Sequence, residues 1–239
     1  NYLAANVFAT YEDSFKENHN LKIMAGFNYE SYHRKNIDAT GYDLITDELS
    51  DFNLITTTRQ PVLGGGQTLY ALAGFFGRIN YDYKGRYLLE ISGRYDGTSR
   101  FAEGHRFGFF PSASAGWRVS EEPWFAPAKD VVNNLKVRAS YGSLGNQKVT
   151  NNAWMRKITF DNFGAYTFDG AAMGRYATIS APNASDLTWE TSTQYNTGID
   201  AGLFNDKLMF TVEGFIRDTK GMLQQGVALP GVYGANSPL

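Results

Sequence analysis

The fold is decided by residues Tyr81–Phe101, which read YDYKGRYLLEISGRYDGTSRF. Beyond the Lys84-Gly85 dipeptide, apolar and polar residues alternate with a period of two, as they do along a β-strand with two different faces. The apolar face of this expected strand carries Tyr87, Leu89, Ile91, Gly93 and Tyr95, and the polar face carries Leu88, Glu90, Ser92, Arg94 and Asp96. Such a strand lies between two different solvents.

The residues before the turn repeat the pattern in the opposite direction. Between positions 71 and 83 the odd-numbered residues are mainly apolar or aromatic, and polar residues such as Arg78 and Asp82 lie between them. Aromatic residues, among them Tyr83 and Tyr87, gather at the turn on the apolar face. These features predict a transmembrane β-hairpin with lipid outside, a wet lumen inside and an aromatic belt at the membrane interface.

The composition excludes several other classes of protein. The formal net charge of the 239 residues is −2, so no basic surface for nucleic acid is expected. The chain has no cysteine, which excludes a disulfide framework and cysteine-based sites. No apolar run approaches the length of a membrane-spanning helix. Because lipid cannot satisfy open backbone groups, a spanning chain without such helices must form a closed barrel.

Six further segments alternate in the same way, which gives about eight expected strands. They are residues 2–11, 21–30, 106–120, 135–141, 189–203 and 208–216. Short turns alternate with two long connections without periodicity, Ser31–Leu69 and Gly145–Leu187, as short periplasmic turns and long extracellular loops do in outer-membrane barrels. Gly64-Gly65-Gly66 is expected at a flexible loop apex, and Pro127 is expected to open one or two helical turns within Pro123–Asn134.

Six motifs follow one another along the chain with characteristic order and spacing. They are YDYKGRY at 81–87, RYDGTSRF at 94–101, FPSASAGWR at 110–118, LKVRASYG at 135–142, GNQ at 145–147 and WETS at 189–192. This set resembles the barrel of the SusC/RagA-type TonB-dependent outer-membrane transporters. The resemblance covers nearly all of the chain and implies an all-β, antiparallel transmembrane β-barrel segment of about eight strands, taken from a barrel of about 22 strands.

The resemblance also implies how the whole protein works. Residues 1–239 would be part of a single TonB-dependent receptor β-barrel domain, with the plug domain and the C-terminal strand absent from this excerpt. The implied function is TonB-energised import of oligosaccharides, glycans or peptides across the outer membrane of a Gram-negative bacterium. The implied partners are a SusD-like surface lipoprotein, the TonB–ExbB–ExbD complex acting through the missing N-terminal part, outer-membrane lipid and the oligosaccharide or peptide substrate.

No catalytic, cofactor or metal site is expected, so we do not predict an enzyme. The three histidines His19, His33 and His105 lie in separate connections without ligand spacing. Glu121 and Glu122 are adjacent and point apart in an extended segment, so we interpret them as solvated turn charges. The charges on the polar face either line a substrate path or contact a plug, or they pair across neighbouring strands, and we favour pairing for most of them. These charges are Glu90, Arg94, Asp96, Arg118, Arg138, Glu213 and Arg217.

Candidate contacts with substrate or with the lid lipoprotein lie in the second long connection and at the strand ends beside it. Aromatic rings stack on sugars or pack on peptide side chains, although loop self-packing would use the same residues. The candidate residues are Trp154, Phe163, Tyr166, Asp96, Arg100, Asn146 and Gln147. The strand-end aromatics are assigned instead to the belt or the barrel wall, and these are Tyr83, Tyr87, Trp117, Tyr141 and Trp189.

Two other classes of protein could produce alternating strands. One is a soluble, secreted β-sandwich, such as a lectin-like carbohydrate-binding module, which would bury its apolar faces in a core. The other is an outer-membrane barrel enzyme or adhesin. Alternation over about ten residues or more favours the barrel, because sandwich strands usually run shorter. A barrel enzyme would need a nucleophile and a base facing the lumen, and the sequence offers neither.

Overall fold

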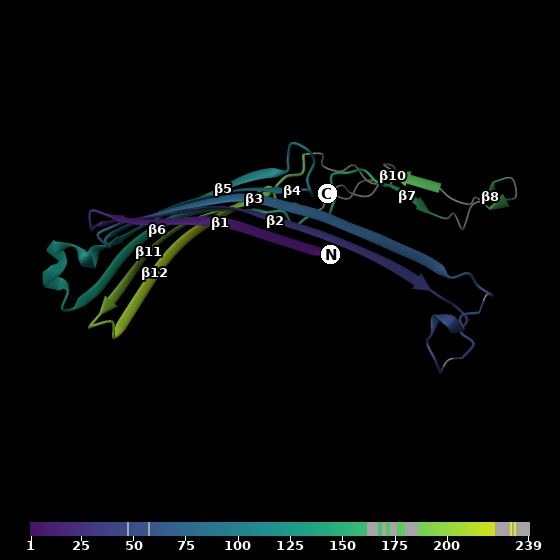
Figure 1. The fold of residues 1–239 in the computed structure, drawn as a ribbon, viewed down its shortest axis with the longest axis horizontal. Coiled ribbons are helices and arrows are strands. Elements are labelled where there is room, and N and C mark those ends of the chain that lie inside the picture. The colour runs from purple at the N-terminus through teal and green to yellow at the C-terminus, as the bar shows by residue number, and fades with distance from the viewer. Residues whose placement is uncertain are drawn as a thin grey trace.

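Eight long antiparallel strands form one curved sheet in the computed structural model (Figure 1), which confirms the expected strand count and class. The structure describes residues 1–46, 48–56, 58–161, 167–168, 171–172, 176–179, 186–222, 230 and 232. The strands are β1 (Tyr2–Phe15), β2 (His19–Thr40), β3 (Val62–Tyr83), β4 (Tyr87–Thr98), β5 (Phe107–Arg118), β6 (Val132–Asn146), β11 (Glu190–Leu203) and β12 (Leu208–Lys220). Their order in the sheet is their order along the chain.

The register places most apolar residues of the eight strands on one face, here called the outer face. One row across it consists of Tyr11, Ile23, Ile79, Ile91, Ala113, Tyr141, Tyr195 and Ile216. The next row points to the opposite, inner face and consists of Glu12, Lys22, Asn80, Glu90, Ser114, Ser140, Asn196 and Phe215. Outer side chains such as Ile91 are 50% exposed, so no second sheet covers them in the described part of the chain, and the β-sandwich alternative is not supported.

A tight turn between β3 and β4 fixes the register of the central hairpin. Lys84 and Gly85 both have positive φ, 55° and 65°, and the Arg86 amide donates to the Tyr83 carbonyl at 3.0 Å. Two consecutive positive φ angles define a type I′ turn, whose twist matches that of the strands it joins. The Gly85 amide also donates to the Asp82 carboxylate at 2.7 Å, which satisfies the turn internally.

Two rows of aromatic residues border the outer face. At the turn end, ring pairs form a continuous ladder through Phe15, His19, Tyr83, Tyr87 and Trp117. Eight positions further along the strands, Phe27 pairs with Phe75 and Tyr95 with Phe109. Eight residues span about 27 Å along a strand and about 21 Å across a membrane at a tilt of about 40°. Phe107, stacked on Tyr95, lies one outer-face row beyond, and including it extends the height to about 26 Å, close to the apolar band of an outer-membrane barrel.

The first long connection is shorter than the sequence indicates, and the expectation of about forty irregular residues at Ser31–Leu69 was wrong. Strands β2 and β3 each continue for 22 residues and pair from His19 with Tyr83 to Thr40 with Val62. Gly64-Gly65-Gly66 therefore lies inside β3, opposite Asn36–Asp38, and not at a loop apex. Residues 33–40 of β2 and 62–69 of β3 project as a two-stranded ribbon past the end of β4. The 3-10 helix η1 (Phe52–Leu54) lies at the tip of this ribbon (Figure 1).

The remaining connections also contain more structure than the sequence predicted. Within the second long connection, β7 (Ile158–Asp161) pairs with β10 (Tyr176–Ile179), and β8 (Thr167–Phe168) pairs with β9 (Ala171–Ala172). Two 3-10 helices, η2 (Val119–Glu121) and η3 (Pro123–Ala128), join β5 to β6. The helical turn begins at Pro123 and contains Pro127, whereas we expected Pro127 to open it. None of the helices in the described residues has the length and hydropathy needed to cross a membrane.

Candidate functional site on the inner face and at the loop end

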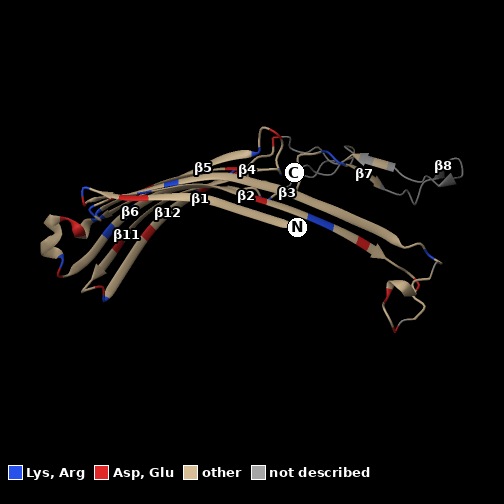
Figure 2. Ribbon diagram, viewed as in Figure 1, with Lys and Arg blue, Asp and Glu red and all other residues tan. Residues whose placement is uncertain are grey.

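Some of the charged side chains of the inner face pair with a neighbouring strand, as favoured from the sequence, whereas Arg94 and Asp96 pair within β4. Arg138 on β6 contacts the Asp200 carboxylate on β11 at 3.2 Å and the Glu213 carboxylate on β12 at 2.8 Å. The Asn80 amide donates to Glu90 at 2.6 Å, and Arg217 donates to the Gln194 amide oxygen at 2.7 Å. Figure 2 shows acidic and basic positions interleaved along the strands. The inner face therefore carries charges of both signs, and neither sign dominates.

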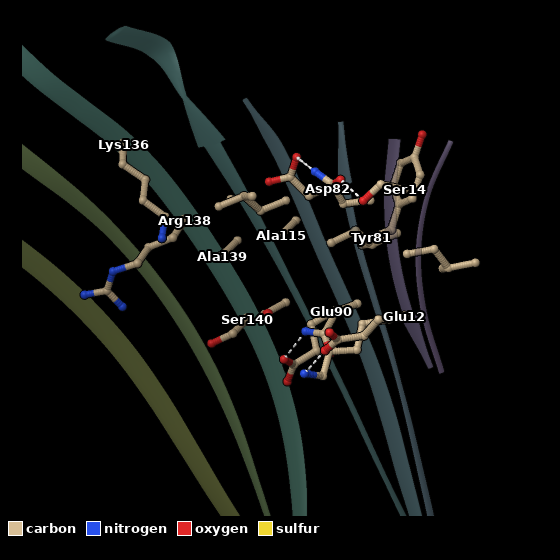
Figure 3. Close-up of a pocket in the computed structure, with 18 of the residues that line it drawn as sticks. Glu12, Ser14, Tyr81, Asp82, Glu90, Ala115, Lys136, Arg138, Ala139 and Ser140 are labelled. Carbon is tan, nitrogen blue, oxygen red and sulfur yellow. Dashed lines mark hydrogen bonds and ion pairs between the residues drawn. The ribbon is translucent and has the colours of Figure 1, made fainter. Parts of the chain in front are cut away.

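A hollow of about 1000 Å³ lies against this face near the turn end. Its lining comes from β1 to β6 and β11. In the close-up of Figure 3, Lys136 and Arg138 lie on one side of the hollow, and Glu12, Asp82 and Glu90 lie across from them. The described residues contain no cluster of three or more acidic or histidine side chains that would hold a metal ion. The hollow is thus lined by charges of both signs together with apolar side chains such as Leu88 and Ala115.

Asp96, one of the candidate residues, lies on the inner face near the end of β4. Its carboxylate receives two hydrogen bonds from Arg94, at 2.8 and 3.0 Å, and Arg94 also donates to the Asn28 side chain at 3.1 Å. Gly74 makes room for this group, because a Cβ atom at that position would collide with the Asp96 and Asn28 oxygens. Asp96 is thus held within the wall and positions Arg94.

Arg100 takes part in a different arrangement at the loop end. Its guanidinium lies over the ring of Tyr70, 4.4 Å from the centroid, and Nη1 donates to the Val149 carbonyl at 3.3 Å. The Tyr70 hydroxyl in turn lies 3.4 Å from the Glu30 carboxylate. Tyr70 and Glu30 both have inner-face parity, and the ring of Tyr70 stacks on that of Tyr32 at 5.2 Å. Cation, ring and carboxylate therefore meet at the loop end of β2, β3 and β4.

Residues 147–155, here called the strap, follow β6 and reach back to β3. Besides the contact of Val149 with Arg100, the Asn151 side chain donates to the Leu69 carbonyl at 3.1 Å. β3 is three strands away from β6 in the sheet, so the strap passes the ends of β4 and β5. The structure thereby brings candidate Arg100 next to the segment that contains candidates Gln147 and Trp154.

The other candidates have separate positions. Asn146 is the last residue of β6, and its side chain accepts a hydrogen bond from the Lys148 amide at 3.0 Å. The side chains of Gln147 and Trp154 each contain a fully buried polar atom, Oε1 and Nε1 respectively, without a hydrogen-bond partner among the described residues. Phe163 and Tyr166 lie outside the described residues.

Trp189 belongs to a buried cluster at the loop end, and its assignment to the belt or wall missed this role. Its ring packs edge-on against Phe101 and Phe110, with centroid distances of 5.7 and 5.2 Å. Phe101 is completely buried, and the Trp189 indole donates to the Arg106 carbonyl at 3.0 Å. Glycines 108 and 145 leave the space that the Phe110 ring occupies. Gly108 and Gly145 are the sequence signal for this packing, because neither carries a Cβ atom that would collide with the Phe110 ring.

Glu122 also differs from the expected solvated turn charge. Its carboxylate accepts hydrogen bonds from the Tyr87 hydroxyl at 2.6 Å and the Trp117 indole at 3.0 Å, and it lies 3.6 Å from Arg86. Its side chain is only 9% exposed. These two hydrogen bonds, that of Tyr87 foremost, hold the pKa of Glu122 below its ordinary value. Glu122 therefore fixes the polar edges of two belt residues.

The family model described as TonB dependent receptor-like, beta-barrel matches residues 1–238. The chain belongs to this family. The TonB-dependent receptor P39 of Formosa agariphila is 32% identical over 218 residues, a match that covers 90% of this chain and 20% of that protein. The TonB-dependent receptor SusC of Bacteroides thetaiotaomicron is 31% identical over 226 residues, covering 92% of this chain and 21% of that protein.

Solved structures of a peptide importer have the same fold over this segment. The structure of the RagAB peptide importer in the "closed-closed" state aligns with a TM-score of 0.85 and 28% identity, covering 99% of this chain and 25% of that chain. The structure of the RagAB peptide transporter aligns with a TM-score of 0.83. These findings confirm the resemblance to SusC/RagA-type transporters, and they identify the sheet as a segment of a TonB-dependent β-barrel. The chain spans about a fifth of the length of the curated relatives that it matches.

Proposed function

We propose that this chain forms part of the wall of an outer-membrane transporter that imports nutrients with energy delivered by TonB. The observation that carries this proposal is the two-faced sheet: an apolar outer face between two aromatic rows, and a polar inner face with paired charges. Such an apolar outer face can remain without a covering layer of protein only where it contacts lipid. Residues 1–239 would then belong to one barrel domain, together with further strands and a plug.

The substrate is proposed to be an oligosaccharide or a peptide, and the transporter itself is not an enzyme in this proposal. SusC and the RagAB peptide importer are relatives or structural neighbours of this chain, and they support a polymeric nutrient as the class of cargo. The inner hollow, with charges of both signs, would contact a plug or a polar cargo. Trp154, Phe163 and Tyr166 in the second connection are proposed to contribute to cargo capture or lid contact.

The loop end is proposed to meet a SusD-like surface lipoprotein. The β2–β3 ribbon projects beyond the aromatic row that contains Phe27, Phe75 and Tyr95, so it would stand outside the membrane. Ile37 on this ribbon is 86% exposed and Leu63 is 76% exposed. Contact of these apolar side chains with water is unfavourable. A protein partner that covers these side chains would remove the free-energy cost of exposing them to water.

Deletion of the gene in the source bacterium tests this function. We expect the deletion strain to lose growth on one class of oligomer, either glycan or peptide, and a strain without TonB to show the same defect. Full-length protein restored with an affinity tag should fractionate with the outer membrane and co-purify a lipoprotein. Restored Trp154→Ala protein should assemble normally and transport less. Unimpaired growth on every oligosaccharide and peptide source, or recovery of the protein in the soluble fraction, would contradict the proposal.

A further inference from the structure

The connection between β5 and β6 is much longer than the other connections at the turn end. It comprises residues 119–131, and its helical turns form the teal coil at that end of the sheet (Figure 1). The other connections at this end are residues 16–18, 84–86 and 204–207, which are mainly charged residues, asparagine and glycine. In the long connection, residues 123–128 read PWFAPA and contain no charged side chain. Because three or four residues suffice to join neighbouring strands at this end, the apolar segment must have a further role.

This apolar segment is exposed although its conformation is well defined. Residues 123–128 form η3, and all of them except Phe125 are exposed, with Trp124 at 62%. The Phe125 and Lys129 amides each donate to the carbonyl three residues earlier. Across the base of the segment, the Lys129 ammonium lies 3.4 Å from the Glu121 carboxylate. A fixed apolar segment of this kind is unfavourable in water, and such surfaces mark sites of contact with a membrane or a protein.

Trp124 continues the aromatic ladder of the outer face. Its ring packs edge-on against that of Trp117, with a centroid distance of 6.4 Å, and Trp117 in turn stacks on Tyr87. Phe125 follows, with its ring 5.9 Å from that of Trp124. The residue of β6 opposite Trp117 is Val137, so the ladder passes from β5 into the connection and not to β6. The apolar segment is thus continuous with the row of rings that lies at the membrane interface on the strands.

The chemistry of the segment is suited to the same interface. Charged residues bracket it, with Glu121 and Glu122 before it and Lys129 and Asp130 after it. Segments of this composition lie in the plane of a membrane surface, where apolar side chains reach about 5–10 Å into the boundary between headgroups and acyl chains. Continuity with the ladder favours lipid over a soluble protein as the partner, because the neighbouring rings of the ladder belong to the outer face of the sheet.

We propose that the β5–β6 connection lies in the plane of the membrane interface at the turn end, where Trp124 and Phe125 insert among phospholipid headgroups. This inference rests on the proposed role of the sheet as a wall in the outer membrane. It adds a lipid-binding surface that lies outside the strands. The rigid connection would thereby fix the depth at which β5 and β6 leave the membrane.

Tryptophan fluorescence of the purified full-length protein in phosphatidylcholine vesicles tests this inference. The acyl chains carry bromine, a short-range quencher, either near the headgroup or near the methyl end. Subtracting the emission of Trp124→Phe from that of the unmodified protein isolates the emission of Trp124. We expect shallow bromine to remove about half of this emission and deep bromine to remove little of it, as for a ring about 5–10 Å below the membrane surface. Trp124→Tyr provides the same subtraction if Trp124→Phe fails to assemble.

Two other tryptophans provide matched controls through the same subtraction. Trp117, on the outer face of β5, should be quenched by bromine, and Trp189, packed in the loop-end cluster, should not. Quenching of Trp117 without quenching of Trp124 would overturn the inference and leave the wall function intact, and so would stronger quenching of Trp124 by deep bromine than by shallow bromine. If neither Trp117 nor Trp124 were quenched, the wall function would fail together with the inference.

Discussion

The two ends of the sheet use aromatic side chains in opposite ways. At the turn end, Tyr83, Tyr87 and Trp117 form an open ladder on the outer face, and Tyr87 and Trp117 remain 46% and 39% exposed. At the loop end, Phe101 and Trp189 pack edge-on in a closed cluster in which Phe101 has no exposed surface. The same residue types therefore serve as membrane-facing groups at one end and as a small core at the other.

The difference follows from the solvent at each end. Rings at the level of a membrane interface gain by contact with lipid and headgroups, so they need no cover from the protein. Rings on the inner face or in the loops would otherwise contact water, and at the loop end they are buried against one another. Glycines 108 and 145 provide the necessary space at the loop end, whereas at the turn end the carboxylate of Glu122 provides polar partners.

The largest expected effect on stability comes from removing a ring of the closed cluster at the loop end. Phe101→Ala should lower the free energy of unfolding by about 3–5 kcal/mol, because a fully buried phenylalanine leaves a cavity. Phe15→Ala at the turn end removes a ring of the same size that is 42% exposed, and about 1 kcal/mol is expected. Urea unfolding of the full-length protein in detergent measures both. Equal losses would show that the two ends are packed alike.

A second comparison tests whether lipid faces the strands between the two ends. Ala113 and Ser114 are neighbours in β5 and point to the outer and inner faces, respectively, and the Ala113 row lies midway between the aromatic rows. Ala113→Arg should cost about 2–4 kcal/mol, as arginine does near the bilayer midplane, whereas Ser114→Arg faces the lumen and should be tolerated. Assembly yield and urea unfolding in lipid vesicles provide the measurement. A greater loss for Ser114→Arg would reverse the assignment of the faces.

Sequence alternation predicted the sheet well wherever the two faces meet different solvents. From the turn to about Tyr70 the outer face is apolar and the inner face polar, so the period of two revealed the strands. Beyond that point the ribbon of β2 and β3 lacks sustained alternation, and we expected a loop there. A two-stranded ribbon outside the membrane has no lipid-facing side, so regular strands can exist without the pattern that predicts them.

The candidate site was predictable only in part. Arg100, Gln147 and Trp154 were chosen from the sequence, and the structure places Arg100 against the strap that contains the other two. Tyr70, Glu30 and Glu122 were missed because their partners come from distant positions. Tyr70 is 30 residues from Arg100, and Glu122 bonds to Tyr87 across 35 residues. Contacts of this kind depend on strand register, which local patterns do not specify.

The smallest expected effect concerns the carboxylate that orders the turn end. Because its folded-state pKa lies below the ordinary value, Glu122 adds stability that is fully present above about pH 4.3 and is lost as the pH falls through the lower, folded-state pKa. Glu122→Gln should therefore lower the urea midpoint slightly at pH 5–8, and the difference from the unmodified protein should vanish under acidic conditions. Glu121→Gln is the matched control, since the 41% exposed Glu121 contacts only Lys129 among the described residues and should change the midpoint little at any pH. If the urea midpoint of Glu122→Gln stays below that of the unmodified protein by a constant amount down to pH 3, the loss comes from a poorer fit of the amide and not from the missing charge. The hydrogen bonds from Tyr87 and Trp117 would then order the turn end without depending on the carboxylate.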